Sequence, residues 1–138
     1  MSTEGPATAP ATGRASPTPQ AVVLVVDDDP DIGDSIGDVL RSGGYQVEIV
    51  ADGQAAVEVA REKRVGMVLL DWRLPTEPCG GALVRRLRDI CGFGVPVVVL
   101  SADPTSLVEA REAQVSDYLP KPFEVDDLLH LVDSYCPP

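Results

Sequence analysis

Histidine, cysteine and positive charge are scarce in this sequence. Its 138 residues include one histidine, three cysteines, and 11 lysines and arginines against 22 aspartates and glutamates. The net charge of -11 argues against a nucleic-acid-binding surface, because such surfaces gather lysine and arginine around phosphates. The cysteines (Cys79, Cys91 and Cys136) lack the spacing of metal or redox motifs. We therefore expect free thiols in a reducing cytoplasm.

Long apolar runs are also missing. No segment approaches the roughly 20 apolar residues of a membrane span, and the N-terminus lacks the apolar stretch of a signal peptide. Residues 1–20 are almost all small residues and proline, with no large apolar side chain except Met1. Such a segment cannot offset the entropy that it would lose on ordering. The sequence thus predicts a disordered tail over 1–20 and one domain over 21–138, with no contact to a membrane.

From residue 21 onward, short runs rich in valine and leucine alternate with helical patterns. This alternation is the signature of repeated βαβ units, and the continuous apolar runs are typical of strands buried on both faces. We expect five strands, the second over 45–50, and five helices in an α/β fold. The helices are expected from Pro30 to the Gly43-Gly44 pair, after Asp52, around Leu83 to Gly92, from Pro104 to about Ala113, and from about Val125.

Four of the expected strands stop abruptly at polar residues. The runs are followed, in chain order, by Asp27-Asp28-Asp29, Asp71, Ser101 and Lys121. Ligand-binding groups gather at the carboxyl ends of parallel strands. If the four strands are neighbours, three carboxylates, a hydroxyl and an ammonium group therefore converge on one spot.

Such an acidic cluster needs a positive charge. Three carboxylates within about 5 Å of one another repel by roughly 3 kcal/mol per pair at an effective dielectric constant of 20. Oxygen ligands completed by water and phosphate suit Mg²⁺, whereas the absence of cysteine and histidine from the four motifs excludes a zinc or iron site. A carboxylate screened by the metal can act as a nucleophile toward phosphorus. Lys121 would then pair with the phosphoryl oxygens, and Ser101 would donate a hydrogen bond to them.

The order of these motifs resembles the receiver domain of two-component response regulators, of the chemotaxis-regulator type. The resemblance covers residues 21–138, and its motifs are Val25-Val26-Asp27-Asp28-Asp29-Pro30, Leu70-Asp71-Trp72-Arg73-Leu74-Pro75, Leu100-Ser101-Ala102 and Asp117-Tyr118-Leu119-Pro120-Lys121-Pro122-Phe123. It implies a (βα)5 domain, in which a doubly wound parallel sheet has the strand order 2-1-3-4-5.

The resemblance also implies a site chemistry. Asp71 would accept a phosphoryl group from a histidine kinase or phosphotransfer protein, with Lys121 and Ser101 as the other catalytic groups. Mg²⁺ would be bound by Asp28, Asp71 and the backbone carbonyl of Arg73, with Asp27 acting through a water. The domain would catalyse only its own phosphotransfer and dephosphorylation, so we do not expect an enzyme in the usual sense.

A switch is implied as well. Ser101 and Tyr118 would form its coupled pair, and the face made by the fourth helix, fifth strand and fifth helix would bind a downstream protein. The chain would be a monomer or a phosphorylation-dependent dimer, and the Lys121-Pro122 bond would be cis. Arg73 and Asp103, two residues after Asp71 and Ser101, would overhang the phosphoryl group. We predict that their ion pair obstructs the water that hydrolyses it.

Three features depart from the family pattern. Residues 75–81 look one residue longer than usual, and the stretch from Ser101 to Lys121 looks two residues shorter, which should trim the start of the fourth helix. Gln114 stands where a helix-terminating glycine is common, so this turn needs an unusual C-cap. None of these departures touches the expected phosphorylation residues.

Other functions fit parts of this pattern. The aspartate triplet contains the Asp-x-Asp of haloacid-dehalogenase-type phosphatases, but Pro30 follows where that family expects threonine or valine. A flavodoxin-like flavin carrier would need a phosphate cradle, and an acidic triplet repels phosphate. A pseudo-receiver that is indifferent to phosphate remains an alternative. Because the chain carries no output domain, we expect a stand-alone switch, with a fragment of a larger regulator as the alternative.

Overall fold

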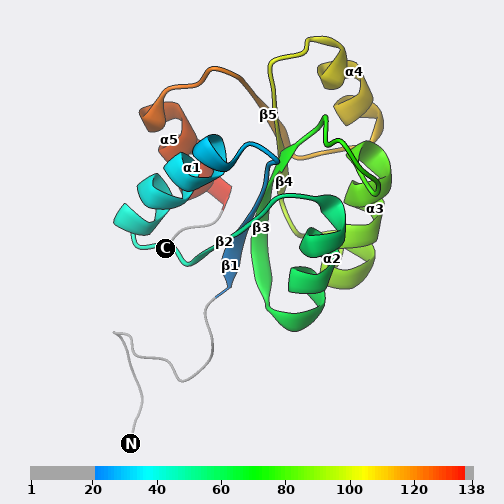
Figure 1. Ribbon diagram of the computed structural model, residues 1–138, viewed down its shortest axis with the longest axis horizontal. Coiled ribbons are helices and arrows are strands. Elements are labelled where there is room, and N and C mark those ends of the chain that lie inside the picture. The colour runs from blue at the N-terminus through cyan, green and yellow to red at the C-terminus, as the bar shows by residue number, and fades with distance from the viewer. Residues whose placement is uncertain (1–20, 136–138) are drawn as a thin grey trace, which may run out of the picture.

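The computed structural model describes residues 21–135. The predicted disordered tail, residues 1–20, and the last three residues, with Cys136, lie outside this range. Five parallel strands form one sheet in the order β2-β1-β3-β4-β5 (Figure 1), which confirms the predicted topology. The strands are β1 (Val22–Val26), β2 (Val47–Val50), β3 (Val65–Asp71), β4 (Val97–Ser101) and β5 (Asp117–Pro120).

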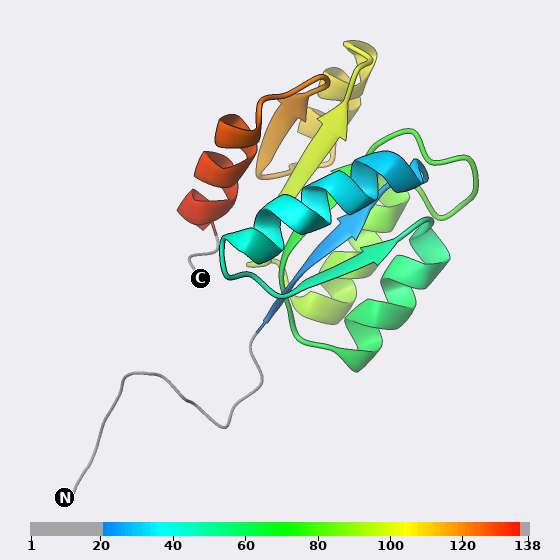
Figure 2. The ribbon, with the colours of Figure 1, turned by 60° about the vertical axis from the view of Figure 1, so that its left-hand side comes forward.

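Five helices cover the two faces of this sheet. On one face lie α1 (Pro30–Ser42) and α5 (Val125–Tyr135), and on the other lie α2 (Gly53–Glu62), α3 (Gly80–Cys91) and α4 (Thr105–Glu112). Figure 2 shows α1 in front of the sheet, with α2 and α3 behind it. Among residues 21–135, no helix is long and apolar enough to cross a bilayer.

The core has two layers because successive side chains of a strand point to opposite faces. All five residues of β1 are buried, as are all five of β4. Leu24 and Val26 pack with α2 and α3, while Val23 and Val25 pack with α1 and α5. These two strands are therefore packed on both faces of the sheet.

The first helix begins where the sequence predicts. Asp29 caps it by accepting a hydrogen bond from the Asp31 backbone N–H at 3.0 Å, and Pro30 occupies the first turn. The second strand, however, begins at Val47 rather than at the predicted Tyr45. The Tyr45 backbone N–H donates to the Leu40 carbonyl at 3.1 Å, so this residue belongs to the turn that ends α1.

The fourth helix is short, with eight residues. Gln114, just beyond it, has a φ of 59°, a conformation that glycine adopts more readily. The guanidinium of Arg88 on α3 donates to the carbonyls of Ala113 (3.1 Å) and Gln114 (2.8 Å). These bonds satisfy carbonyls at the end of α4 and constitute the unusual C-cap that Gln114 requires.

Candidate functional site

Three carboxylates meet at the carboxyl end of the sheet. Asp27, Asp28 and Asp71 each offer an oxygen, and these oxygens lie within 4.8 Å of one another. The register explains the meeting, because Val26 at the end of β1 pairs with Leu70 on β3, and the acids follow directly. Asp27 is buried with 2% exposure and Asp71 with 8%, while Asp28 is exposed. The acidic cluster expected from the sequence is therefore present.

The protein environment makes the charged form of Asp71 unfavourable. Burial raises its pKa from 3.8 to about 6; the ammonium of Lys121 opposes this shift, and the charges of Asp27 and Asp28 add to it. The backbone N–H of Arg73 donates to Asp71 Oδ1 at 3.3 Å and also stabilises the carboxylate. A cation beside these oxygens would relieve the repulsion.

Lys121 reaches this cluster from the end of β5. Its Nζ lies 2.9 Å from Asp27 Oδ2 and 3.9 Å from Asp71 Oδ2. The Lys121-Pro122 peptide bond is cis, as the resemblance implied. Because the ammonium lies closer to Asp27, it leaves Asp71 only partly neutralised.

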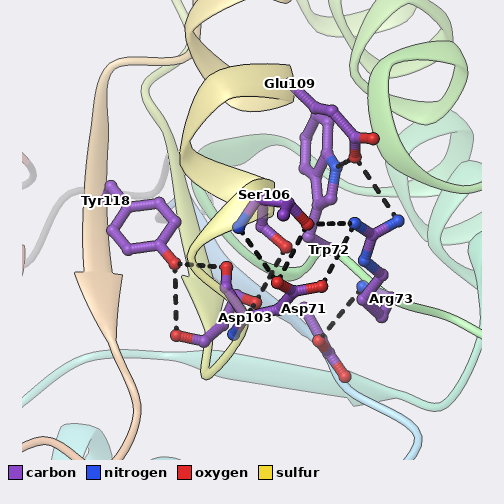
Figure 3. Close-up of polar contacts among 9 residues, drawn as sticks. Asp71, Trp72, Arg73, Asp103, Ser106, Glu109 and Tyr118 are labelled. Atoms are coloured by element: carbon purple, nitrogen blue, oxygen red, sulfur yellow. Dashed lines mark hydrogen bonds and ion pairs between the residues drawn. The ribbon is translucent and has the colours of Figure 1, made fainter.

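Ser101 ends β4, which lies next to β3 in the sheet, and it is 3% exposed. Its Oγ accepts a hydrogen bond from the Asp103 backbone N–H at 3.0 Å and lies 3.0 Å from Oγ of the fully buried Ser106. The Tyr118 hydroxyl donates to the Asp103 carbonyl at 3.1 Å and lies 3.4 Å from that of Ser101 (Figure 3). Both expected switch residues therefore contact the segment between β4 and α4.

The expected partners Arg73 and Asp103 form an ion pair, with Arg73 Nη2 3.2 Å from Asp103 Oδ2. Both side chains are about half exposed. Asp103 also accepts hydrogen bonds from the backbone and hydroxyl of Thr105, each at 2.9 Å, and these bonds together with Arg73 lower its pKa. The effect of this pair on the lifetime of a phosphoryl group stays a prediction.

Sequence reasoning missed the other polar side chains beside the site. The Trp72 indole N–H donates to Glu109 Oε1 at 2.7 Å, and Arg73 Nη1 lies 3.4 Å from the same oxygen. Arg73 Nη2 donates to the Thr105 hydroxyl at 2.9 Å (Figure 3). The residues missed are Thr105, Ser106 and Glu109. No motif marks them, because their importance comes from the contacts that α4 makes with Trp72, Arg73 and Ser101.

Comparisons with known proteins agree with this geometry. The family model of the response regulator receiver domain matches residues 23–133. The DNA-binding response regulator MtrA of Mycolicibacterium smegmatis is 38% identical over 109 residues, which are 78% of this chain and 46% of that protein. The chain thus spans about half the length of the curated relatives that it matches.

Solved structures show the same architecture. The receiver domain of the sensor histidine kinase PA1611 from Pseudomonas aeruginosa, with a magnesium ion coordinated in its active site cleft, has a TM-score of 0.76 and 34% identity, over 83% of this chain and 96% of that one. The chemotaxis protein CheY4 of Vibrio cholerae has a TM-score of 0.76 and 28% identity, over 85% and 99%. With its fold, its acidic cluster and its family match, this chain belongs to the response regulator receiver domain family.

Proposed function

We propose that the protein is a phosphorylation switch, in which Asp71 accepts a phosphoryl group from a histidine kinase or phosphotransfer protein. The observation that carries the proposal is the position of Asp71. It lies at the end of a central strand, between two further carboxylates and the ammonium of Lys121. This complete set of groups argues against a pseudo-receiver that is indifferent to phosphate.

The donor set fits Mg²⁺. It consists of hard oxygen ligands, it carries three formal negative charges, and it contains no cysteine or histidine. Asp28, Asp71 and the backbone carbonyl of Arg73 would hold the ion, with Asp27 acting through a water. Bound there, the metal would neutralise the acids and the incoming phosphoryl oxygens. The magnesium ion in the PA1611 receiver supports this assignment by analogy.

The chain's own side chains then have separate tasks. An Asp71 oxygen attacks phosphorus, the bond from phosphorus to the donor atom breaks, and an acyl phosphate forms on the carboxylate. Lys121 pairs with the phosphoryl oxygens as a point charge, and the Ser101 hydroxyl donates a hydrogen bond to them. We expect no turnover of another substrate, only this phosphotransfer and the later hydrolysis.

The output of the switch is a change of surface. When Ser101 turns toward the phosphoryl group, Tyr118 loses its partners in the segment after β4 and rotates inward, a shift between two populations of packing. The face of α4, β5 and α5 then binds a downstream protein, or a second phosphorylated copy.

Free thiols at Cys79 and Cys91 suit a reducing cytoplasm.

Two modes of action remain for this switch. One is the stand-alone regulator, which signals through protein contacts alone. The other is the receiver part of a larger regulator, and it is favoured by the relatives, which are about twice as long and include DNA-binding regulators. The phosphorylation chemistry is the same in both modes, so the first experiment does not depend on this choice.

Intact mass after treatment with acetyl phosphate and Mg²⁺ tests the acceptor. The wild type should gain one phosphoryl group, and Asp71→Asn should gain none. Chelation of Mg²⁺ should prevent the gain in the wild type. Equal labelling of the two proteins would remove Asp71 from its role.

Titration with Mg²⁺ tests the metal ligands, with the fluorescence of Trp72 as the readout. Asp28→Ala should weaken binding more than Asp27→Ala does, because a direct ligand loses more than a group that acts through water. Asp31→Ala, which removes an exposed acid from the first turn of α1, is the control for general loss of charge. If Asp28→Ala binds Mg²⁺ as tightly as the wild type, the ligand assignment is wrong.

A further inference from the structure

Helix α4 has little apolar attachment to the rest of the domain. Ser106 and Ala110 are its buried residues, and Val108 is 60% exposed. Pro104 precedes the helix, and the Asp103 carboxylate accepts a hydrogen bond from the backbone N–H of Thr105, its first residue. Burial of a serine and an alanine contributes far less than burial of leucine or isoleucine. Polar contacts therefore supply an unusually large share of what holds α4 in place.

Several of those polar contacts come from the two residues that follow Asp71. The Trp72 indole and the Arg73 guanidinium both reach Oε1 of Glu109, at 2.7 Å and 3.4 Å. Figure 3 shows the two side chains converging on this carboxylate from the end of β3. The two residues that follow the phosphoacceptor strand thus contact the middle of α4 through one carboxylate oxygen.

The same guanidinium serves the start of α4. It lies 3.2 Å from Asp103 Oδ2 and donates to the Thr105 hydroxyl. Within residues 21–135, no other cation lies within ion-pair distance of Asp103 or Glu109. Arg73 is therefore the shared counter-ion of two acids. Asp103 lies between β4 and α4, and Glu109 lies on α4.

We propose that Glu109, Trp72 and Arg73 form a latch, which holds α4 against the segment that follows β3 while Asp71 is unphosphorylated and which opens when Asp71 is phosphorylated. This inference rests on the proposed function, because the phosphoryl group is what opens the latch. A phosphoryl group brings about two negative charges and three acceptor oxygens. Arg73 follows Asp71 by two residues, and its backbone N–H already contacts that carboxylate.

The phosphoryl group competes with Glu109 for Nη1 of the guanidinium, because arginine binds phosphate oxygens with charge-assisted hydrogen bonds. When Nη1 turns to the phosphoryl group, Glu109 keeps only the indole N–H, while Nη2 keeps its ion pair with Asp103. The segment between β4 and α4 can then follow Ser101. Glu109 is a positioning residue in this scheme, since it touches no reacting atom.

The test is a change of charge at Glu109, read by hydrogen exchange of the α4 amides. Glu109→Gln keeps an acceptor for the indole but removes the ion pair. Glu112→Gln is the matched control, because Glu112 lies on the same helix and makes no ion pair within residues 21–135. In unphosphorylated protein, α4 should exchange about fivefold faster in Glu109→Gln than in the wild type, a factor that corresponds to about 1 kcal/mol. Glu112→Gln should exchange at the wild-type rate.

Phosphorylation supplies a readout that a merely structural contact would not give. It should speed α4 exchange in the wild type, and in Glu109→Gln the further change should be less than half as large. Acetyl phosphate should also label Glu109→Gln faster, because the released state is already populated.

Three results would overturn the latch. One is equal α4 exchange in unphosphorylated Glu109→Gln and Glu112→Gln, whatever happens at Asp71. Another is a phosphorylated wild type whose α4 exchange is unchanged. The third is a wild type that takes no phosphoryl group, which would refute the opening step together with the proposed function, while the comparison of unphosphorylated variants would still decide whether the contact holds α4.

Discussion

Helices α1 and α4 both follow strands that end at the acidic site, yet they are held in different ways. The first has a side-chain cap from Asp29 and buries Ile36 and Leu40. The fourth has a comparable bond from the Thr105 backbone N–H to the Asp103 carboxylate, but its two buried residues are small. Apolar packing fixes one helix, and polar contacts to Trp72, Arg73 and Arg88 hold the other.

The two helices therefore have different roles in the domain. The helix with the apolar anchor follows Asp27 and Asp28, which must keep fixed positions to bind a cation. The weakly anchored helix follows Ser101, which must move when the site is phosphorylated. Elements that move are drawn from the least stable parts of a fold. Residues 22–42 thus form a fixed half, which holds the ligating acids in place. Residues 102–135 form a responsive half, which changes when the site is phosphorylated.

The largest expected effect is a difference in stability between two matched leucines. Leu40→Ala on α1 should lower the free energy of unfolding by about 3 kcal/mol, because it opens a cavity in the core. Leu107→Ala on α4 removes a half-buried side chain and should cost about 1 kcal/mol or less. Urea unfolding measures both values. Equal costs would contradict the division between an apolar and a polar anchor.

Asp71→Asn should stabilise the metal-free protein by about 1 to 3 kcal/mol at pH 7.5. The pKa of Asp71 in the folded wild type is raised to about 6, so the folded protein binds a proton more tightly than the unfolded chain does. Wild-type stability should therefore fall as the pH rises from 3.8 to about 6, and the penalty should stay constant above this range.

The control for this prediction is to repeat the measurement of stability at a lower pH, with a chelator of metal ions present throughout. The gain from Asp71→Asn should shrink at pH 4.5, where the wild-type carboxyl is mostly protonated. A gain that is the same at both pH values would show that burial of the ionised Asp71 carboxylate is not the cause.

The C-terminus of α4 offers a smaller effect. Gln114→Gly should raise the free energy of unfolding by about 0.5 to 1 kcal/mol, because glycine adopts the positive φ of this position without strain. Arg88→Met should lower it by about 1 kcal/mol, since it removes the bonds to the carbonyls of Ala113 and Gln114. Thermal unfolding of both variants measures this. Destabilisation by Gln114→Gly would mean that the glutamine side chain supports the turn.

The smallest effect concerns the lifetime of the phosphoryl group. Arg73→Ala and Asp103→Ala should each speed its loss by about two- to fivefold, because exposed ion pairs contribute under about 1 kcal/mol. The double variant should gain little more, since the two side chains act as a unit. Intact mass over time gives the rates. Single variants that lose phosphate at the wild-type rate would show that the ion pair obstructs nothing.

Much of the fold could be predicted because its signals are local. Valine-rich runs that end at acids, the caps at Asp29 and Asp52, and the glycines after the first helix each determine structure within a few residues. The topology followed from the resemblance, and so did the cis bond before Pro122. The start of β2 was misplaced because Tyr45 forms its hydrogen bond backward, to α1.

The contacts of α4 could not be predicted, for a physical reason. Glu109 belongs to a short helix without a clear apolar stripe, and its partners Trp72 and Arg73 lie more than 30 residues away in sequence. Ser106 likewise gives no sequence signal. Its role is visible only in the structure, where its Oγ lies 3.0 Å from Oγ of Ser101. Long-range polar contacts arise from the packing of whole elements, which residue patterns do not encode.

Hydrogen exchange of the phosphorylated and the free wild type distinguishes the fixed half of the domain from the responsive half. Phosphorylation should speed exchange across residues 102–112 and change it through β5 and α5, and it should leave residues 22–42, which contain β1 and α1, unchanged. No difference anywhere in residues 102–135, or an equal change in α1, would contradict the division into a fixed half and a responsive half.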